Sequence, residues 1–143
     1  MAFIDRFEHT LDDRGRVAVP ARYRPMFAEG VVLVRGSEGC IELYTPQDFR
    51  ELSRPILRAS SATKRGRRLK RGLYPNCRQD ELDGQGRILL PASFRQWAGL
   101  DSTVIIVGRG DCLELWSPEY LEKEQIRVAE AYNEGLDDLE SLE

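Results

Sequence analysis

The chain contains the same segment twice. Residues 11–24 read LDDRGRVAVPARYR and residues 82–95 read LDGQGRILLPASFR, with seven of fourteen positions identical. A second match follows at a nearly equal offset, because CIELYTP at 40–46 returns as CLELWSP at 112–118. A long repeat seen only twice is typical of a duplicated half-domain and not of a solenoid. We therefore expect two similar halves that pack against each other as a pseudo-dimer.

A chain of 143 residues has room for one domain, or for two small halves that share a core. We divide it into three parts. Residues 1–54 form the first repeat with its following helix, residues 55–78 form a basic connecting segment, and residues 79–143 form the second repeat with a C-terminal helix and an acidic tail.

Short apolar runs bounded by turn residues predict strands, for example Val31–Arg35 and Thr103–Val107. Pro55 is expected to close the first long helix. The last helix is expected over 118–133 and to end at Gly135, with frayed residues after it. Many short strands with brief helices favour a mainly β fold, a barrel closed by pairing the two halves, with a C-terminal helix added.

The net charge of −3 conceals an uneven distribution. Residues 50–78 contain ten Lys or Arg and one acid, whereas residues 111–143 contain eleven acids and two basic residues. A basic run can bind a polyanion, form a solvated face, or pair with the acidic tail of a neighbouring subunit. The basic residues within 64–71 therefore leave contact with DNA and contact with another subunit both open.

Several classes of function lack their usual sequence signals. Three cysteines without a Cys-x-x-Cys pair, and a single histidine, do not form a metal-ligand pattern. No nucleophile elbow or phosphate-binding glycine loop is present. No apolar run approaches the roughly 20 residues that span a bilayer. We expect no enzyme activity, cofactor, metal, small-molecule substrate or membrane contact, and a cytoplasmic location.

The chemically distinctive unit is Asp-x-x-Gly-Arg, which occurs as Asp12 to Arg16 and again as Asp83 to Arg87. The glycine permits a positive φ in a tight turn, and the aspartate can accept backbone N–H groups inside that turn. The arginine can pair with the same aspartate and so be held in one orientation, suited to a guanine edge or a phosphate. Spacing alone favours a structural staple over a binding site, and duplication does not decide between them.

The paired motifs with Pro20 and Pro91, the central Arg67–Arg71 run and the closing Glu114-Leu115-Trp116 resemble the MraZ family of bacterial transcriptional regulators. This family belongs to the AbrB-like swapped-hairpin superfamily, and the resemblance covers about residues 1–125. It implies a double-split β-barrel made from two tandem AbrB-like halves. One departure is Asp5, which stands where the family usually has glycine.

The resemblance further implies binding to double-stranded DNA at short direct promoter repeats upstream of division and cell-wall genes, usually with repression. It implies a ring-shaped homo-oligomer that associates with the nucleoid. The resemblance assigns DNA binding to Arg14, Arg16 and Arg87. It assigns support of the turns to Asp12, Gly15, Asp83 and Gly86.

Two other interpretations remain. An antitoxin-like or protein-interaction module of the same superfamily would use its helices or its tail, residues 136–143, to hold a protein partner. A barrel enzyme would need a pocket with perturbed ionisable groups, which the sequence does not offer.

Overall fold

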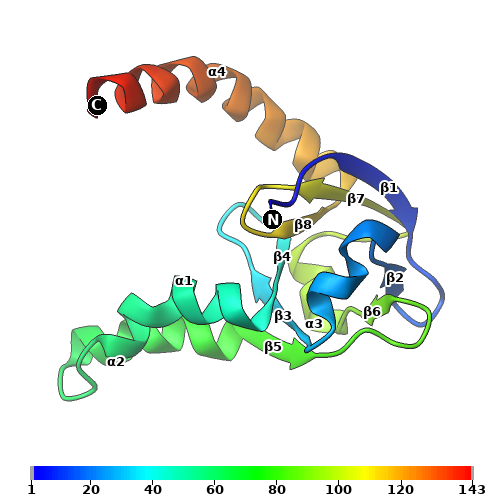
Figure 1. Ribbon diagram of the computed structural model, residues 1–143, viewed down its shortest axis with the longest axis horizontal. Helices are drawn as coiled ribbons and strands as arrows, with labels where there is room; N and C mark the ends of the chain where they lie inside the picture. Colours follow the sequence, from blue (N-terminus) through cyan, green and yellow to red (C-terminus); the bar gives the residue numbers. More distant parts are fainter. Residues whose placement is uncertain (1, 143) are drawn as a thin grey trace.

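The computed structural model describes residues 2–142, with side chains described to residue 140. Eight strands and several helices alternate along the chain (Figure 1). The strands are β1 (Arg6–Thr10), β2 (Arg16–Ala18), β3 (Val31–Arg35), β4 (Ile41–Tyr44), β5 (Cys77–Asp80), β6 (Arg87–Leu89), β7 (Thr103–Gly108) and β8 (Leu113–Trp116). The helices are η1 (Ala21–Phe27), α1 (Pro46–Arg58), α2 (Lys64–Leu73), η2 (Tyr74–Asn76), α3 (Ala92–Trp97) and α4 (Pro118–Leu142).

The two sequence copies exchange strands. One sheet has the order β1-β7-β8-β4-β3-β5, and a second, two-stranded sheet pairs β2 with β6. In the large sheet, β1 is equivalent to β5, β3 to β7 and β4 to β8. Exchanging these equivalent strands gives the same strand order read from the opposite edge. A pseudo-twofold axis therefore relates the two halves. The axis passes through the middle of each of two antiparallel residue pairs, Val17 opposite Ile88 in the small sheet and Glu42 opposite Glu114 in the large sheet. The expected β-rich fold with short helices and a C-terminal helix is confirmed.

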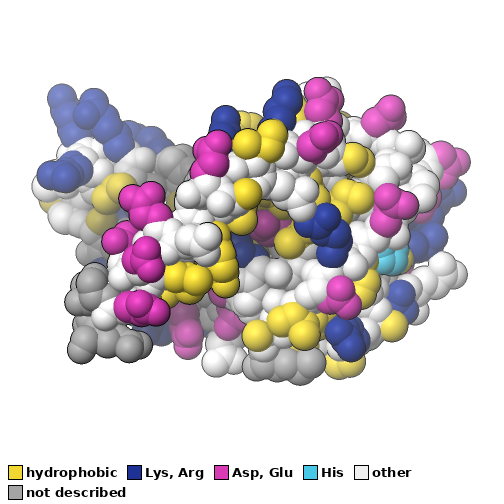
Figure 2. All heavy atoms as spheres, turned by 90° about the horizontal axis from the view of Figure 1, so that it is seen from above, with side chains coloured by type: hydrophobic (Ala, Val, Ile, Leu, Met, Phe, Trp, Pro, Cys, Tyr) yellow, Lys and Arg dark blue, Asp and Glu magenta, His cyan; other side chains and the backbone are white. Residues whose placement is uncertain are grey.

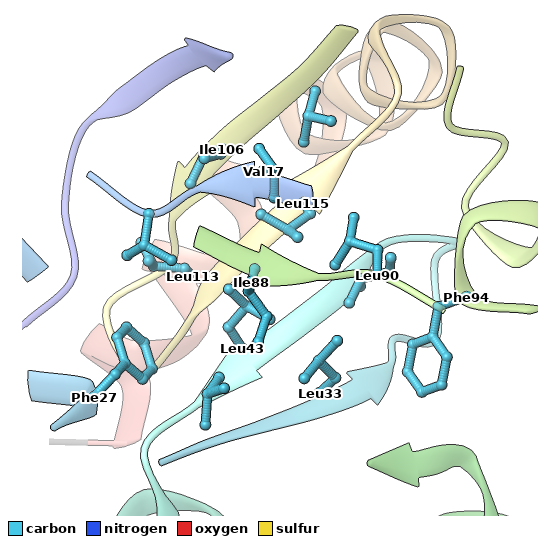
Figure 3. Packing of buried hydrophobic residues seen from close by; sticks show 14 of the residues in the cluster. Val17, Phe27, Leu33, Leu43, Ile88, Leu90, Phe94, Ile106, Leu113 and Leu115 are labelled. Atoms are coloured by element: carbon cyan, nitrogen blue, oxygen red, sulfur yellow. The ribbon is translucent and has the colours of Figure 1, made fainter. Parts of the chain in front are cut away.

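The core lies between the large sheet and the small β2–β6 ribbon, and both copies contribute to it (Figure 3). Val17 and Ile88 of the ribbon point at Leu43 and Leu115 of the sheet, and all four side chains are at most 1% exposed. The core is complete only when side chains of both halves are present. The ribbon is therefore fixed on its inner face, which leaves its turns at the surface.

Two expected helix ends are wrong. The first helix continues through Pro55 to Arg58. Pro55 is exposed, so water can replace the single backbone bond that proline removes. The last helix continues through Gly135 to Leu142 instead of fraying. One glycine costs a helix only about 1 kcal/mol, which twenty-four other helical residues outweigh.

Helices α1 and α2 form a hairpin arm, and α4 forms a second arm, and the two extend away from the sheets on the same side of the molecule (Figure 1). Figure 2 shows carboxylates and hydrophobic side chains along the projecting part of α4, with Lys and Arg gathered on the hairpin arm. The exposed apolar residues of α4 include Ile126, Val128, Tyr132 and Leu139. Among the described residues, no helix is both long enough and apolar enough to cross a bilayer.

Candidate nucleic-acid interface

The first turn is built on the carboxylate of Asp12. Its Oδ1 accepts the backbone N–H groups of Arg14 and Arg16, each at 2.9 Å, and its Oδ2 accepts Nε of Arg16 at 2.8 Å. Backbone bonds close the turn at Gly15, whose N–H donates to the Asp12 carbonyl oxygen, and whose φ of +80° suits glycine. This is the arrangement that the sequence predicts.

The second turn repeats these bonds. Asp83 Oδ1 accepts the backbone N–H groups of Gln85 and Arg87 at 2.9 Å, and its Oδ2 accepts Nε of Arg87 at 3.0 Å. Gly86 has φ +76° and donates its N–H to the Asp83 carbonyl oxygen. The two copies therefore hold their arginines by the same device.

The two turns also hold each other, which the sequence does not reveal. Strands β2 and β6 run antiparallel, so the motif arginines face each other diagonally across the ribbon. Arg16 Nη1 lies 3.8 Å from Asp83 Oδ2, and Arg87 Nη1 lies 3.6 Å from Asp12 Oδ2. Each guanidinium thus contacts the carboxylates of both copies. Two positive and two negative side chains form one cluster at the surface.

The motif arginines remain open to solvent. The side chain of Arg16 is 25% exposed and that of Arg87 is 28% exposed. Arg14, at the tip of the first turn, is exposed, as is Gln85 at the matching place in the second turn. The ribbon therefore presents two guanidinium groups held by aspartates, with one additional exposed cation, Arg14, on the first turn only.

The carboxylates that orient the arginines stay ionised. Backbone hydrogen bonds from Arg16 hold the pKa of Asp12 below its usual value, and those from Arg87 do the same for the pKa of Asp83. Because both carboxylates carry a negative charge at neutral pH, the four-charge cluster has no net charge. Its arginines can offer directed N–H groups, but the cluster attracts a polyanion only weakly.

Two further arginines lie against the turns, and sequence reasoning missed them. Arg24 packs over Gly86 of the opposite copy, and Arg95 packs over Gly15. Both are the last residue of the repeated fourteen-residue segment. Their recurrence was visible, but their cross-copy contact depends on the strand exchange and has no local signal.

A second polar cluster lies on the pseudo-twofold axis, where Glu42 and Glu114 face each other across β4 and β8. Two like charges in this position repel. Arg109 Nη1 donates to both carboxylates, and its Nη2 donates to the Tyr44 hydroxyl at 2.8 Å. The Cys40 thiol donates to Glu114, and the Cys40, Glu42 and Glu114 ligand atoms lie within 4.8 Å of one another.

The Arg109 guanidinium occupies this cluster, so we interpret it as a structural network. Burial raises the pKa of the Cys40 and Cys112 thiols, which keeps both protonated and poor as metal ligands. The sequence shows no metal-ligand pattern among the cysteines, and it does not reveal that Cys40 and Cys112 flank an acidic pair.

A family model described as "MraZ protein, putative antitoxin-like" matches residues 2–72 and residues 74–135, which correspond to the two halves. A protein of Mycoplasmoides gallisepticum called transcriptional regulator MraZ is 37% identical over 133 residues, covering 93% of this chain and 88% of the relative.

Two further relatives carry the same name. The Thermomicrobium roseum protein is 39% identical over 117 residues, which cover 82% of each chain. The Methylococcus capsulatus protein is 37% identical over 135 residues, which cover 91% of this chain and 89% of the relative. The residues that the family model matches, 2–72 and 74–135, include both ribbon turns and all six strands of the large sheet.

Proposed function

Because this chain belongs to the MraZ family, we propose that it is a DNA-binding transcriptional regulator that reads its operator through the two ribbon turns. The regulator role is supported by relatives that carry the name transcriptional regulator. The residues that we propose for contact with DNA are Arg16 and Arg87, assisted by Arg14.

One observation carries this proposal: two arginines on one ribbon are each fixed by two carboxylates and remain partly exposed. Since Nε is bound to the aspartate, the terminal nitrogens keep N–H groups free to bind other acceptors. A guanidinium held in one orientation can donate two parallel bonds to guanine O6 and N7, a contact worth about 1–3 kcal/mol of discrimination. A purely structural staple needs neither exposure nor a second carboxylate.

We propose that the operator consists of short direct repeats at a promoter, upstream of division and cell-wall genes. Binding to these repeats represses transcription, and the protein associates with the nucleoid. Each subunit offers two arginines for contact with the bases and should bind one repeat weakly. Several linked subunits on successive repeats would gain affinity through effective concentration without any new contact. Tandem sites and self-association therefore support each other.

Self-association is supported by the charges of the two arms. The hairpin arm, residues 46–73, has nine Lys or Arg and two acids, whereas α4 has eight acids and two basic residues in 118–142. Both arms also expose apolar side chains, such as Leu57 on the hairpin and Ile126 on α4. We propose that opposite arms of neighbouring copies meet head to tail, with a rotation between copies that closes the assembly into a ring.

The test measures, by fluorescence anisotropy, binding of the full chain to promoter DNA with two or more spaced repeats. A scrambled duplex is the control. Arg16→Ala and Arg87→Ala are each expected to weaken binding to the repeats about 5- to 150-fold per contacted repeat, while the particle mass in solution stays unchanged. Unchanged affinity in the double variant would show that the turns do not read DNA.

A second candidate function is favoured by the antitoxin-like description of the family and by the apolar side of α4. In that case the arm would bind a protein partner and the turns would be structural staples. Deletion of residues 136–143 separates the two functions. It should leave operator binding intact if the turns read DNA, and it should abolish capture of the partner if the arm is the functional surface.

A further inference from the structure

The four charges of the motif cancel, so the attraction of the ribbon for DNA must come from other residues. We propose that Arg24 and Arg95 form a pair of phosphate-binding sites, one on each side of the ribbon, that grip the DNA backbone while Arg16 and Arg87 face the bases. This inference rests on the proposed function and adds to it the residues that supply the electrostatic affinity.

Both arginines lie on the glycine of the opposite turn, across the pseudo-twofold axis. A Cβ added to Gly86 would lie 2.3 Å from Arg24 Nε, and one added to Gly15 would lie 2.1 Å from Arg95 Nη1. The guanidinium groups therefore rest directly on the glycine of the opposite turn. Arg24 Nε also donates to the Val19 carbonyl oxygen at 2.8 Å. Arg24 is fixed in this way and therefore loses little conformational freedom when it binds a ligand.

The positive charge of both residues is uncompensated. Among the described side chains, no carboxylate lies within 4.0 Å of either guanidinium. Among the described residues, only Arg35 Nε and Tyr74 Oη are buried side-chain polar atoms without a hydrogen-bond partner. The terminal nitrogens of Arg24 and Arg95 are not among these buried atoms. The terminal nitrogens of Arg24 and Arg95 therefore reach solvent, with N–H groups available.

The surface beside Arg24 has room for a phosphate. A hollow of about 340 Å³ lies between Arg24 and the turn at 83–86. Asp83 lines it but is already bound to Arg87, whereas Glu81 also lines it, is exposed, and forms no salt bridge with any described side chain. The phosphate oxygens would therefore face the Arg24 guanidinium. Guanidinium groups bind phosphate through parallel, charge-assisted hydrogen bonds.

The symmetry of the pair suits a duplex. Arg24 and Arg95 occupy equivalent positions of the two copies, so they flank the motif arginines on opposite sides. A groove of DNA is bordered by one phosphate backbone on each side, and phosphate contacts position a protein without reading sequence. The ribbon would thus have base-facing arginines at its centre and backbone-facing arginines at its edges.

The experiment measures the dissociation constant of the full chain by anisotropy, for promoter repeats and for a scrambled duplex, over a series of salt concentrations. Arg24→Gln and Arg95→Gln are each expected to lower the slope of log K against log salt by about 0.9 per bound subunit. They should weaken binding to both duplexes by the same factor. Arg78→Gln on β5, outside the ribbon and both arms, makes the same change in net charge and should leave the slope unchanged.

Lysine variants separate charge from packing. Arg24→Lys and Arg95→Lys keep the charge but lose the planar group that lies on the glycine, so they should restore the slope. A purely structural role predicts the opposite pattern, with a lower melting temperature in both the Gln and Lys variants and an unchanged slope. That result overturns the inference, as does a changed preference for the repeats over the scrambled duplex. Failure of the unaltered chain to bind either duplex would instead refute the proposed function.

Discussion

The contact between Arg24 and Gly86 makes a quantitative prediction about glycine substitutions in one turn. Gly86→Ala places a side chain at φ +76°, which costs about 1–2 kcal/mol for a residue other than glycine. The new Cβ also meets Arg24 at Nε, Cδ and Cζ, between 2.3 and 2.7 Å. Because these atoms lie in the middle of the side chain, Arg24 must leave and lose its bond to Val19, which adds about 1 kcal/mol.

We therefore expect Gly86→Ala to lower the free energy of unfolding by about 2–3 kcal/mol, or the melting temperature by about 5–10 °C. Gly15→Ala should cost less, about 1–2 kcal/mol, because its closest neighbour is the free end of Arg95 and can move aside. Gly84 lies in the same turn as Gly86, with open space around its Cβ position. Gly84→Ala is the matched control and should change stability by less than about 0.5 kcal/mol.

Urea unfolding followed by tryptophan fluorescence measures these differences. A double-mutant cycle isolates the contact, because Gly86→Ala in an Arg24→Ala background should retain only the backbone strain. The expected coupling is about 1 kcal/mol. Equal costs for Gly86→Ala and Gly84→Ala, or no coupling with Arg24, would refute the claim that the arginine lies on the opposite turn.

Three other perturbations follow from the structure. Arg109→Gln should lower the free energy of unfolding by about 3 kcal/mol, measured by urea titration, because it leaves two opposed glutamates uncompensated on the axis. Cys40 and Cys112 should react with a thiol reagent at pH 8 at least tenfold more slowly in the folded chain than in urea, since burial raises the pKa of both thiols; equal rates would contradict this. The lowered pKa of Asp12 stabilises the fold above its ordinary pKa of 3.8, and this contribution is lost as pH falls below it. Asp12→Asn should therefore be less stable than the unaltered chain at pH 6, with the gap narrowing below pH 3.8 in thermal unfolding. A constant gap would count against the carboxylate bonds.

Local features of this fold could be predicted from the sequence. The turn at Asp12 depends on residues within four positions of one another, so its bonds follow from the spacing and from the properties of glycine and aspartate. Strands such as β3 and β7 have continuous apolar runs that indicate burial. The turns and these strands can therefore be predicted from residues that lie close together in the sequence.

The features that join the two halves could not be predicted in this way. The pairing of β1 with β7, and the position of Arg24 over Gly86, depend on which strand of the other copy lies alongside. The meeting of Glu42 and Glu114 has the same origin, and only one half supplies an arginine to balance them. Duplication alone does not distinguish halves that pack side by side from halves that exchange strands.

The helix ends failed for a different reason. Proline and glycine indicate helix termini on average, but each costs a limited free energy that a long helix can absorb. Pro55 lies on an exposed face of α1, and Gly135 lies within the twenty-five residues of α4. Exposure and helix length decided both cases, and neither was visible in the local pattern.

The claim that the ribbon arginines read guanine is tested most directly by removing the acceptor from the DNA. A duplex selected by the full chain from random sequence is remade with 7-deazaguanine, which lacks N7, at one guanine at a time. We predict that at least one replacement weakens binding of the unaltered chain by about 5-fold or more, and that the Arg16→Ala, Arg87→Ala double variant is insensitive to the same replacement. Equal sensitivity in the two proteins, or none in the unaltered chain, would contradict the account.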